Sequence, residues 1–443
     1  MKTLLTTRRA ADRLRAGHLW VYRSDLIEDP ENLARPERTA DAAGSTRAAD
    51  IAPGALVTVA DPRQIPLGTA LYSTSSQIAA RMVSRAPELT RAEYLSNTAE
   101  RLAAALALRR ELAPLDDRTN AQRLVFAEAD NLPGIVLDLY NDVALLQLLT
   151  QGTAQDDVRR TVAEALQHER ELSSARPLTL WERTDPRIVK LEQLAPPSPG
   201  ALFSTAAEPV QKTVFSLNGL RFHYDAGAGQ KTGAFLDQRL NYAAAARTMA
   251  ASGRRRRALD ICTYQGGFAL HLATVCEHVT GVDQSRAALE VAEANATLNA
   301  SLRAKPEWVE ADAFELLRAL DDASRPGAAA NETLPVRAGS FDALVLDPPA
   351  FAKNRRAVEG ALRGYKELNL RALRLLTAGG TLVTCSCSHH VPLEEFTEVV
   401  RAAAADAGRR VQLLEVRGAA PDHPEVLTLP ETRYLKCLIA RVD

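Results

Sequence analysis

The sequence predicts an α/β protein whose C-terminal domain is doubly wound and Rossmann-like, preceded by a small β-rich domain and a central α+β domain. Residues 257–283 read as a β-α-β unit, because an apolar run ending in an acid leads through paired glycines into an apolar helix and a second strand. The helix–strand rhythm persists beyond this unit, whereas the N-terminal part alternates short apolar runs with turns. We expect domains at residues 1–85, 90–200 and 213–443.

Composition describes a soluble protein of two or three domains. The 443 residues are 46% hydrophobic and 25% charged, and the formal net charge is −1. No apolar run approaches the roughly 18 residues of a membrane span, and the N-terminus lacks a secretory signal, so we expect a cytoplasmic protein without membrane contact. The five cysteines are an odd number without zinc-site spacing, which predicts reduced thiols and no metal. The residues leave the oligomeric state open, a homodimer included.

Basic residues gather locally although the whole chain is nearly neutral. Residues 1–23 hold six Lys and Arg against one acid, Asp12, and residues 353–374 hold seven against Glu359 and Glu367. Such patches neutralise phosphates, so we expect them to contact RNA unless they are solvated surface without a role.

The first two domains follow from short-range patterns. Apolar runs at 54–59 and 67–72 predict strands, and the polar, Ala-rich stretch 29–50 predicts a long disordered loop. In the central domain we expect helices over 91–113 and 155–171 and strands over 124–126, 134–140, 143–148 and 178–182. The Pro-rich run 195–200 predicts a linker or a stiff excursion.

The third domain is expected to begin with a hairpin at 215–222, because its alternating residues surround an Asn-Gly pair. Residues 227–239 then lead into the helix before the β-α-β unit. Gln238 in this stretch is suitably placed to close over a ligand, although an ordinary loop before a capped helix would look similar.

The β-α-β unit predicts a nucleoside-bearing cofactor. Gly266 and Gly267 allow close backbone approach at a helix N-terminus, and Asp283 ends the second strand, where an acid commonly binds ribose hydroxyls. The run 262–267 lacks the Gly-x-Gly-x-x-Gly spacing of nicotinamide sites. Asp260 would repel a pyrophosphate but hold the cationic amino-acid end of S-adenosylmethionine (SAM). We therefore expect SAM rather than a nucleotide-free helix start.

Later strands add candidates to the same crevice. Asp312 follows a third strand and suits a hydrogen bond to the adenine amino group. We expect helices at 285–299, 359–376 and 392–407, strands near 308–309, 341–346, 381–384 and 411–416, and an antiparallel last strand at 434–440. Five parallel strand ends thus face one crevice. The candidate cofactor-binding residues are Gln238, Asp260, Tyr264, Gly266, Gly267, Asp283, Asp312 and Asp347.

Two of these strand ends carry residues suited to chemistry on a base. Asp347-Pro348-Pro349-Ala350-Phe351 fixes the backbone after an acid and presents a carboxylate, carbonyls and a ring to a planar group, although a turn with a packed Phe would look alike. The strand 381–384 leads into Cys385-Ser386-Cys387-Ser388. A thiolate that adds to C6 of cytosine makes C5 nucleophilic, whereas nitrogen methylation needs no thiol. Nearby basic residues would lower a cysteine's pKa and favour this use over a buried hydrophobic role.

The chain resembles bacterial large-subunit (23S) ribosomal RNA cytosine-C5 methyltransferases I nearly end to end. The matching runs are 19–22 (LWVY), 128–134 (EADNLPG), 146–149 (LQLL), 231–233 (KTG), 236–239 (LDQR), 266–268 (GGF), 347–351 (DPPAF), 364–366 (GYK), 386–388 (SCS) and 422–424 (DHP). The resemblance implies an N-terminal PUA domain, a Rossmann-like SAM domain, 23S rRNA as substrate and 5-methylcytosine as product. It places Cys387 as nucleophile and Asp347 at the N3/N4 edge of the cytosine, and the base could stack on Phe351.

Some positions depart from the family pattern. Cys385 stands where members commonly have an aromatic residue, and His389 and His390 replace a less polar pair. Ala350 follows the prolines where another branch of RNA cytosine methyltransferases has a cysteine, so the group that removes the C5 proton is unassigned. Two other functions remain open: methylation of an exocyclic base nitrogen without a cysteine, and a non-catalytic RNA-binding or ribosome-assembly factor with a degenerate SAM pocket.

Overall fold

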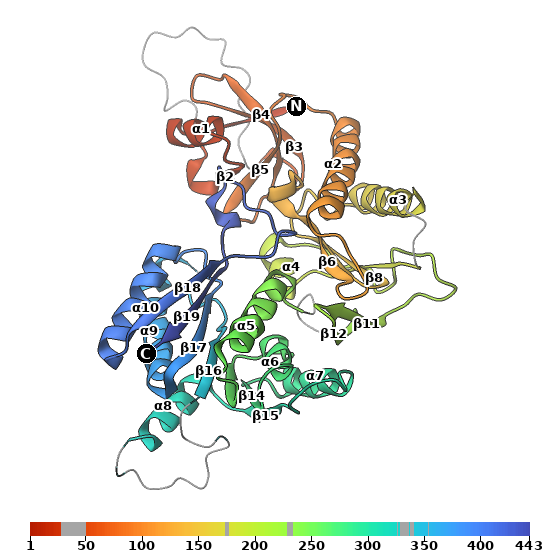
Figure 1. The fold of residues 1–443 in the computed structure, drawn as a ribbon. Coiled ribbons are helices and arrows are strands. Elements are labelled where there is room, and N and C mark those ends of the chain that lie inside the picture. Colours follow the sequence, from red (N-terminus) through yellow and green to blue (C-terminus); the bar gives the residue numbers. More distant parts are fainter. Residues whose placement is uncertain are drawn as a thin grey trace.

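The computed structural model describes residues 1–27, 50–172, 177–227, 234–325, 327, 336, 341–352 and 354–443. It shows three sheets in chain order and one hairpin (Figure 1). Most of the loop expected at 29–50, the run 231–233 and residue 353 lie outside the described residues.

The N-terminal domain is a five-stranded sheet of order β1-β3-β4-β5-β2. β1 is parallel to β3 and the other pairs are antiparallel. Its elements are β1 (Lys2–Leu5), α1 (Arg8–Arg15), β2 (Trp20–Tyr22), β3 (Leu56–Ala60), β4 (Pro66–Tyr72) and β5 (Ile78–Ser84). The side chains of Leu4, Val57, Ala70 and Ala80 belong to its core, so the alternating apolar runs form a β-rich domain as predicted.

The central domain packs helices on the sheet β10-β9-β8-β7-β6. Its elements are α2 (Arg91–Leu112), β6 (Ala121–Phe126), β7 (Ile135–Tyr140), β8 (Val143–Leu148), α3 (Asp156–Leu172), β9 (Thr179–Glu182), α4 (Pro186–Glu192) and β10 (Phe203–Ser204). Each expected strand and helix is present. The Pro-rich run is an excursion rather than the end of this sheet, because β10 returns after it to pair with β9.

A hairpin of β11 (Lys212–Leu217) and β12 (Leu220–Asp225) joins the central domain to the last one. Asn218 (φ 54°) and Gly219 (φ 89°) both adopt left-handed conformations, as a two-residue type I′ turn requires. The Asn-Gly prediction is confirmed.

The C-terminal domain is a seven-stranded sheet of order β15-β14-β13-β16-β17-β19-β18. The first five strands are mutually parallel and β19 is antiparallel to β17, as predicted. Its strands are β13 (Arg257–Ile261), β14 (His278–Asp283), β15 (Glu307–Glu310), β16 (Phe341–Leu346), β17 (Leu376–Ser386), β18 (Val411–Arg417) and β19 (Lys436–Val442). Its helices are α5 (Arg239–Ser252), α6 (Gly267–Ala273), α7 (Arg286–Thr297), α8 (Ala313–Ala323), α9 (Val358–Leu375) and α10 (Leu393–Ala407).

Alternate residues of the central strands point to opposite faces, and each face has its own core. Leu259 and Leu344 pack with α8–α10, whereas Ala258 and Ala343 pack with α5 and α6. Because helices cover both faces, the carboxyl ends of the parallel strands form the open edge where such sheets bind ligands.

The segment 418–435, between β18 and β19, connects all three domains. Figure 1 shows it passing beside β2. Asp422 accepts a hydrogen bond from the Arg123 backbone N–H of the central domain (2.8 Å), and Glu431 lies 3.5 Å from His18 Nε2 of the first domain. The sequence patterns gave no sign of this excursion.

Candidate functional site

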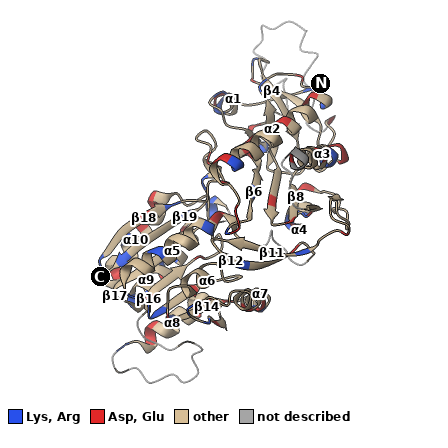
Figure 2. Ribbon diagram, turned by 45° about the vertical axis from the view of Figure 1, so that its right-hand side comes forward, with Lys and Arg blue, Asp and Glu red and all other residues tan. Residues whose placement is uncertain are grey.

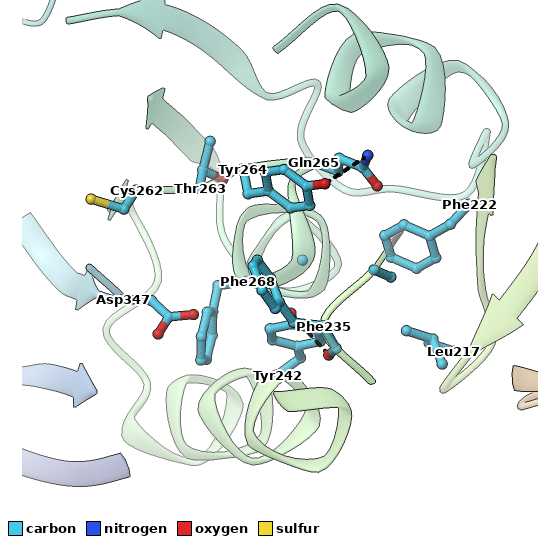
Figure 3. A pocket seen from close by; sticks show the side chains of 12 residues that line it. Leu217, Phe222, Phe235, Tyr242, Cys262, Thr263, Tyr264, Gln265, Phe268 and Asp347 are labelled. Carbon is cyan, nitrogen blue, oxygen red and sulfur yellow. Dashed lines mark hydrogen bonds between the residues drawn. The ribbon is translucent and has the colours of Figure 1, made fainter. Parts of the chain in front are cut away.

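The candidate site lies where β13, β14, β16 and β17 end. Figure 3 shows the loop after β13, with Cys262 to Gln265, above Asp347 at the end of β16, and the rings of Phe235 and Phe268 beside Asp347. The small cavity between them has a volume of ≈ 20 Å³. Cofactor-sized pockets are about 300–1,000 Å³, so this cavity is only a part of the space that SAM occupies.

The loop after β13 has an unusual backbone that its neighbours hold in place. Cys262 (φ 65°) and Tyr264 (φ 52°) are both left-handed, a conformation that costs free energy for residues other than glycine and concentrates at functional sites. The Tyr264 N–H donates to Asp283 Oδ2 (2.9 Å), and the Gln265 carbonyl accepts from Asn295 Nδ2 (3.0 Å). The loop is therefore pre-organised by groups on β14 and α7.

The paired glycines are needed for a reason that the sequence analysis did not foresee. A Cβ on Gly267 would lie 2.5 Å from Tyr242 Cζ, and one on Gly266 would lie 2.9 Å from Trp308 Cη2. Gly266 also has φ 86°. Both positions exclude larger residues through close packing and backbone conformation, independently of any ligand.

Asp260 is completely buried at the end of β13. Its Oδ2 accepts hydrogen bonds from Thr263 Oγ1 (2.5 Å) and the Ala269 N–H (2.9 Å), whereas its Oδ1 is buried without a partner among the described residues. Burial raises its pKa to about 7. An unpaired buried carboxylate oxygen is a costly feature unless a cationic group binds it, so this residue fits the ammonium end of SAM.

The other two candidate acids occupy more open positions. Asp283 is half-buried, and its Oδ1 accepts from the Ser285 N–H (2.9 Å). Asp312 is exposed and caps α8 by accepting from the N–H groups of Phe314 (2.9 Å) and Glu315 (3.0 Å). Carboxylate oxygens accept several hydrogen bonds each, so these caps leave capacity for ribose hydroxyls and an adenine amino group.

Gln238 fixes Asp347. The Gln238 Nε2 donates to Asp347 Oδ1 (2.9 Å), while Asn241 Nδ2 donates to Gln238 Oε1 (2.6 Å) and so sets the orientation of the amide. Burial and the nearby Asp237 and Asp260 carboxylates raise the pKa of Asp347 to about 8. The raised pKa favours the neutral acid at neutral pH, and the Gln238 amide and the Cys385 thiol both hydrogen-bond to this carboxyl group.

The two candidate cysteines lie in different environments. Cys385 is fully buried within β17, opposite Cys437 of β19. Cys387 follows the strand, is half-buried, and its Sγ lies 3.8 Å from the Pro348 carbonyl oxygen. Cys385 also hydrogen-bonds to the Asp347 side chain, but of this pair Cys387 alone has part of its surface exposed.

Hydrogen bonds fasten the Cys387 turn to that loop. The Ser388 Oγ accepts from the Ala352 N–H (3.2 Å), and the Tyr365 hydroxyl lies 3.0 Å from Ser388 Oγ and 3.1 Å from Ser386 Oγ. Phe351 stands between rings, with its centroid 4.8 Å from that of Tyr365 and 5.9 Å from that of Phe314. Two strand ends separated in sequence therefore form one rigid wall.

The prediction of a lowered thiol pKa is wrong. Burial, with the negative charges of Asp347 and Asp237, raises the pKa of Cys387 to about 12. The positive charge of Lys436 lowers this pKa, but it offsets only part of the rise. The His389 and His390 rings are tilted by 42° with their centroids 3.7 Å apart, and burial lowers the pKa of both.

Sequence reasoning missed several groups around this site. The Tyr434 hydroxyl donates to Asp237 Oδ2 (2.5 Å), and Lys436 is buried beside the Cys387 turn. Arg239 Nη1 lies 2.5 Å from Asp422 Oδ1 in a buried ion pair that ties α5 to the segment 418–435. The sequence offered one sign of these groups. Lys436 is a lysine inside the otherwise apolar run 435–440, which indicates a buried charge.

The expected basic patches are partly paired with acids. Arg13 contacts Asp25 (2.5 Å) and Arg15 contacts Asp61 (2.5 Å), while Arg371 and Arg374 share Asp321. Figure 2 shows acidic residues interspersed with Lys and Arg across the domains. Counting only nearby acids in the sequence overstated the local positive charge.

Within the described ranges, no helix is long and apolar enough to cross a membrane. Over the same residues, no cluster of three or more His, Cys, Asp or Glu side chains is arranged to hold a metal ion.

Comparison with known proteins agrees with this arrangement. Residues 6–85 match a PUA-like domain family, and residues 155–439 match the S-adenosylmethionine-dependent methyltransferase family. Ribosomal RNA large subunit methyltransferase I of Tolumonas auensis is 36% identical over 390 residues, which cover 88% of this chain and 90% of that protein. Its Escherichia coli counterpart is 34% identical over 393 residues, covering 88% and 91%.

Solved structures share the fold over the full length. A protein described as a SAM-dependent methyltransferase from Streptococcus mutans superposes with a TM-score of 0.75 at 17% identity, covering 100% of both chains. A methyltransferase solved in complex with SAH gives the same values.

Proposed function

The chain belongs to the family of SAM-dependent ribosomal RNA large subunit methyltransferases I, and we propose that it forms 5-methylcytosine in 23S rRNA through a covalent adduct with Cys387. The observation that carries the proposal is the half-buried Cys387 thiol against the Pro348 carbonyl, beside an acid with a raised pKa. Methylation of an exocyclic nitrogen would need no thiol at this place.

Four carboxylates divide the contacts with SAM in this proposal. Asp260 Oδ1 would hold the ammonium group, Asp283 the ribose hydroxyls and Asp312 the adenine amino group, while Asp347 borders the methyl-donating end. The backbone of Tyr264, Gly266 and Gly267 would line the cofactor. When bound, SAM supplies an electrophilic methyl group.

Asp347 prepares the cytosine. Its carboxyl proton can be donated to N3 of the base, while Oδ1 accepts from the N4 amino group as well as from Gln238. A proton on N3 withdraws electrons from C6, which makes this carbon electrophilic. The residue therefore acts as a general acid whose raised pKa suits neutral pH.

Cys387 supplies the nucleophile. Its thiolate forms an S–C6 bond, and the C5–C6 π electrons become available at C5, which can then take the methyl group. Transfer of the C5 proton to water restores the double bond and expels the thiolate, and N3 returns its proton to Asp347. The base must first leave its stack to reach this edge, and the exposed part of Phe351 offers it a ring to stack on.

Tritium release tests the proposal directly. Substrate rRNA labelled with tritium at C5 of cytosine should release one tritium to water per methyl group transferred, because C5 loses its hydrogen. Cys387→Ala should abolish release and Cys385→Ala should retain it. Methyl transfer without tritium release, with N4-methylcytidine in the nucleoside digest, would assign the exocyclic nitrogen instead.

A further inference from the structure

Lys436 is a buried cation whose ammonium binds neutral backbone carbonyls. Its side chain is 3% exposed at the start of β19, and its Nζ donates to the carbonyls of Ser388 (2.7 Å) and Tyr434 (2.8 Å). In the part of the chain that the structure describes, the hydrogen bonds of this Nζ go to backbone carbonyls and not to a carboxylate. Burying an ammonium in this way is costly, and burial lowers its pKa to about 8.

The lysine brackets Cys387 from two sides. Lys436 pairs with Ser386 in the register of β17 and β19, and its Nζ binds the carbonyl of Ser388. Backbone pairing between the strands therefore holds the residue before Cys387, and the Lys436 ammonium holds the residue after it. The two side chains also influence each other's ionisation, since the ammonium favours the thiolate and the thiolate favours the ammonium.

The remaining charged and titratable groups around Cys387 oppose its ionisation or are neutral near pH 7. Asp347, at the end of β16, and Asp237, in the segment before α5, both raise the pKa of Cys387. Tyr365 of α9 and Tyr434 have raised pKa values and stay neutral. His389 faces Lys436, and its pKa is lowered, so it adds little positive charge. Lys436 is the cation that favours the thiolate among these groups.

We propose that Lys436 is the positioning residue that makes Cys387 reactive, by fixing the turn at residues 386–388 and by placing its ammonium charge beside the thiolate. The proposal deepens the proposed function but concerns the thiol alone, so it holds or fails whichever base atom is methylated. Below about pH 8, Lys436 is charged while Asp347 is neutral, which is the combination that favours the thiolate. The thiol proton passes to water.

Alkylation of Cys387 tests this without RNA or SAM. The full-length protein is treated with iodoacetamide from pH 6 to 10, and the modified peptides are quantified by mass spectrometry. The thiolate forms an S–C bond and iodide leaves. Half-buried Cys262, in the other wall of the site, serves as an internal reference, and Cys387→Ala verifies the assignment.

Three substitutions separate charge from hydrogen bonding. Lys436→Gln keeps N–H donors for the carbonyls but has no charge, and Lys436→Met has neither. We expect both to slow Cys387 alkylation about tenfold or more at pH 7, where Lys436 is charged, which is the effect of one pKa unit. Lys436→Arg should retain the alkylation rate of the wild type. Since arginine stays charged, the effect of the charge on this rate should persist at higher pH. Lys212→Met removes an exposed lysine as the matched control.

A wild-type alkylation rate in Lys436→Gln would overturn the role of the charge, and a wild-type rate in Lys436→Met would overturn the proposal entirely. If Lys436→Met fails to fold, as a melting curve would show, the Gln and Arg variants decide. Altered Cys262 alkylation in all variants would mean a general loosening of the site, which also contradicts the proposal.

Discussion

Asp260→Asn isolates the acid at the end of β13. The Asn side chain keeps an acceptor for Thr263 Oγ1 and the Ala269 N–H but cannot ionise. In the folded protein the pKa of Asp260 is about 7, above its ordinary 3.8, so ionisation is penalised. The penalty is absent below the ordinary pKa and complete above about pH 7. A rise of about three in the pKa of Asp260 corresponds to at most about 4 kcal/mol in the free energy of unfolding. Without SAM, Asp260→Asn should therefore be more stable than the wild type at pH 8.

The effect on SAM binding has the opposite direction. If Asp260 Oδ1 holds the ammonium group, SAM binds the ionised form, and below pH 7 binding must first remove a proton. Apparent affinity should then fall about tenfold, or 1.4 kcal/mol, for each pH unit below 7. Asp260→Asn should bind SAM more weakly at pH 7.5 and show no such decline toward acid pH.

Isothermal titration calorimetry at pH 6, 7 and 8, in two buffers of different ionisation enthalpy, measures both affinity and proton release. We expect close to one proton released per SAM at pH 6 in wild type and none in Asp260→Asn. Asp347→Asn is the control, because it removes the other acid of raised pKa in the crevice. An unchanged pH profile in Asp260→Asn, or a profile flattened only by Asp347→Asn, would refute the assignment of Asp260.

Two further substitutions test the ribose contact of Asp283 and the buried ion pair of Asp422. Asp283→Ala should weaken SAM binding by about 1.5–3 kcal/mol in the same calorimeter while far-ultraviolet circular dichroism stays native, and an unchanged affinity would remove Asp283 from the ribose site. Asp422→Ala should destabilise the protein by about 3–5 kcal/mol in thermal or urea unfolding, because it leaves Arg239 buried and unpaired. Asp422→Asn keeps an acceptor for the Arg123 N–H and should cost less, so equal losses in both variants would contradict a charge-based role.

Local patterns predicted the strands, helices and hairpin well. A strand or helix that buries one face has apolar residues at a characteristic spacing, and this spacing is visible in the sequence. The Asn218-Gly219 turn and the five parallel strand ends are examples. They placed Asp347 and Cys387 at one edge because carboxyl ends of neighbouring parallel strands must meet there.

What the sequence left out depends on partners distant along the chain. Arg15 pairs with Asp61 and Arg371 with Asp321, so local charge counts misjudged both basic stretches. The pKa of Cys387 was predicted in the wrong direction because the sequence does not show that Asp237 lies near this thiol or how deeply the thiol is buried. The return of β10 to the central sheet likewise follows from tertiary packing and not from any local signal.

RNA carrying 5-fluorocytosine at the target tests whether Cys387 bonds to the base, because the fluorine leaves no C5 proton to lose after methyl transfer. The S–C6 bond to Cys387 should then persist. We expect an enzyme–RNA adduct that survives denaturing electrophoresis, requires SAM, forms with Cys385→Ala and fails to form with Cys387→Ala. An adduct lost in Cys385→Ala and kept in Cys387→Ala would move the nucleophile to Cys385, and no adduct in an enzyme active on normal RNA would contradict the covalent mechanism.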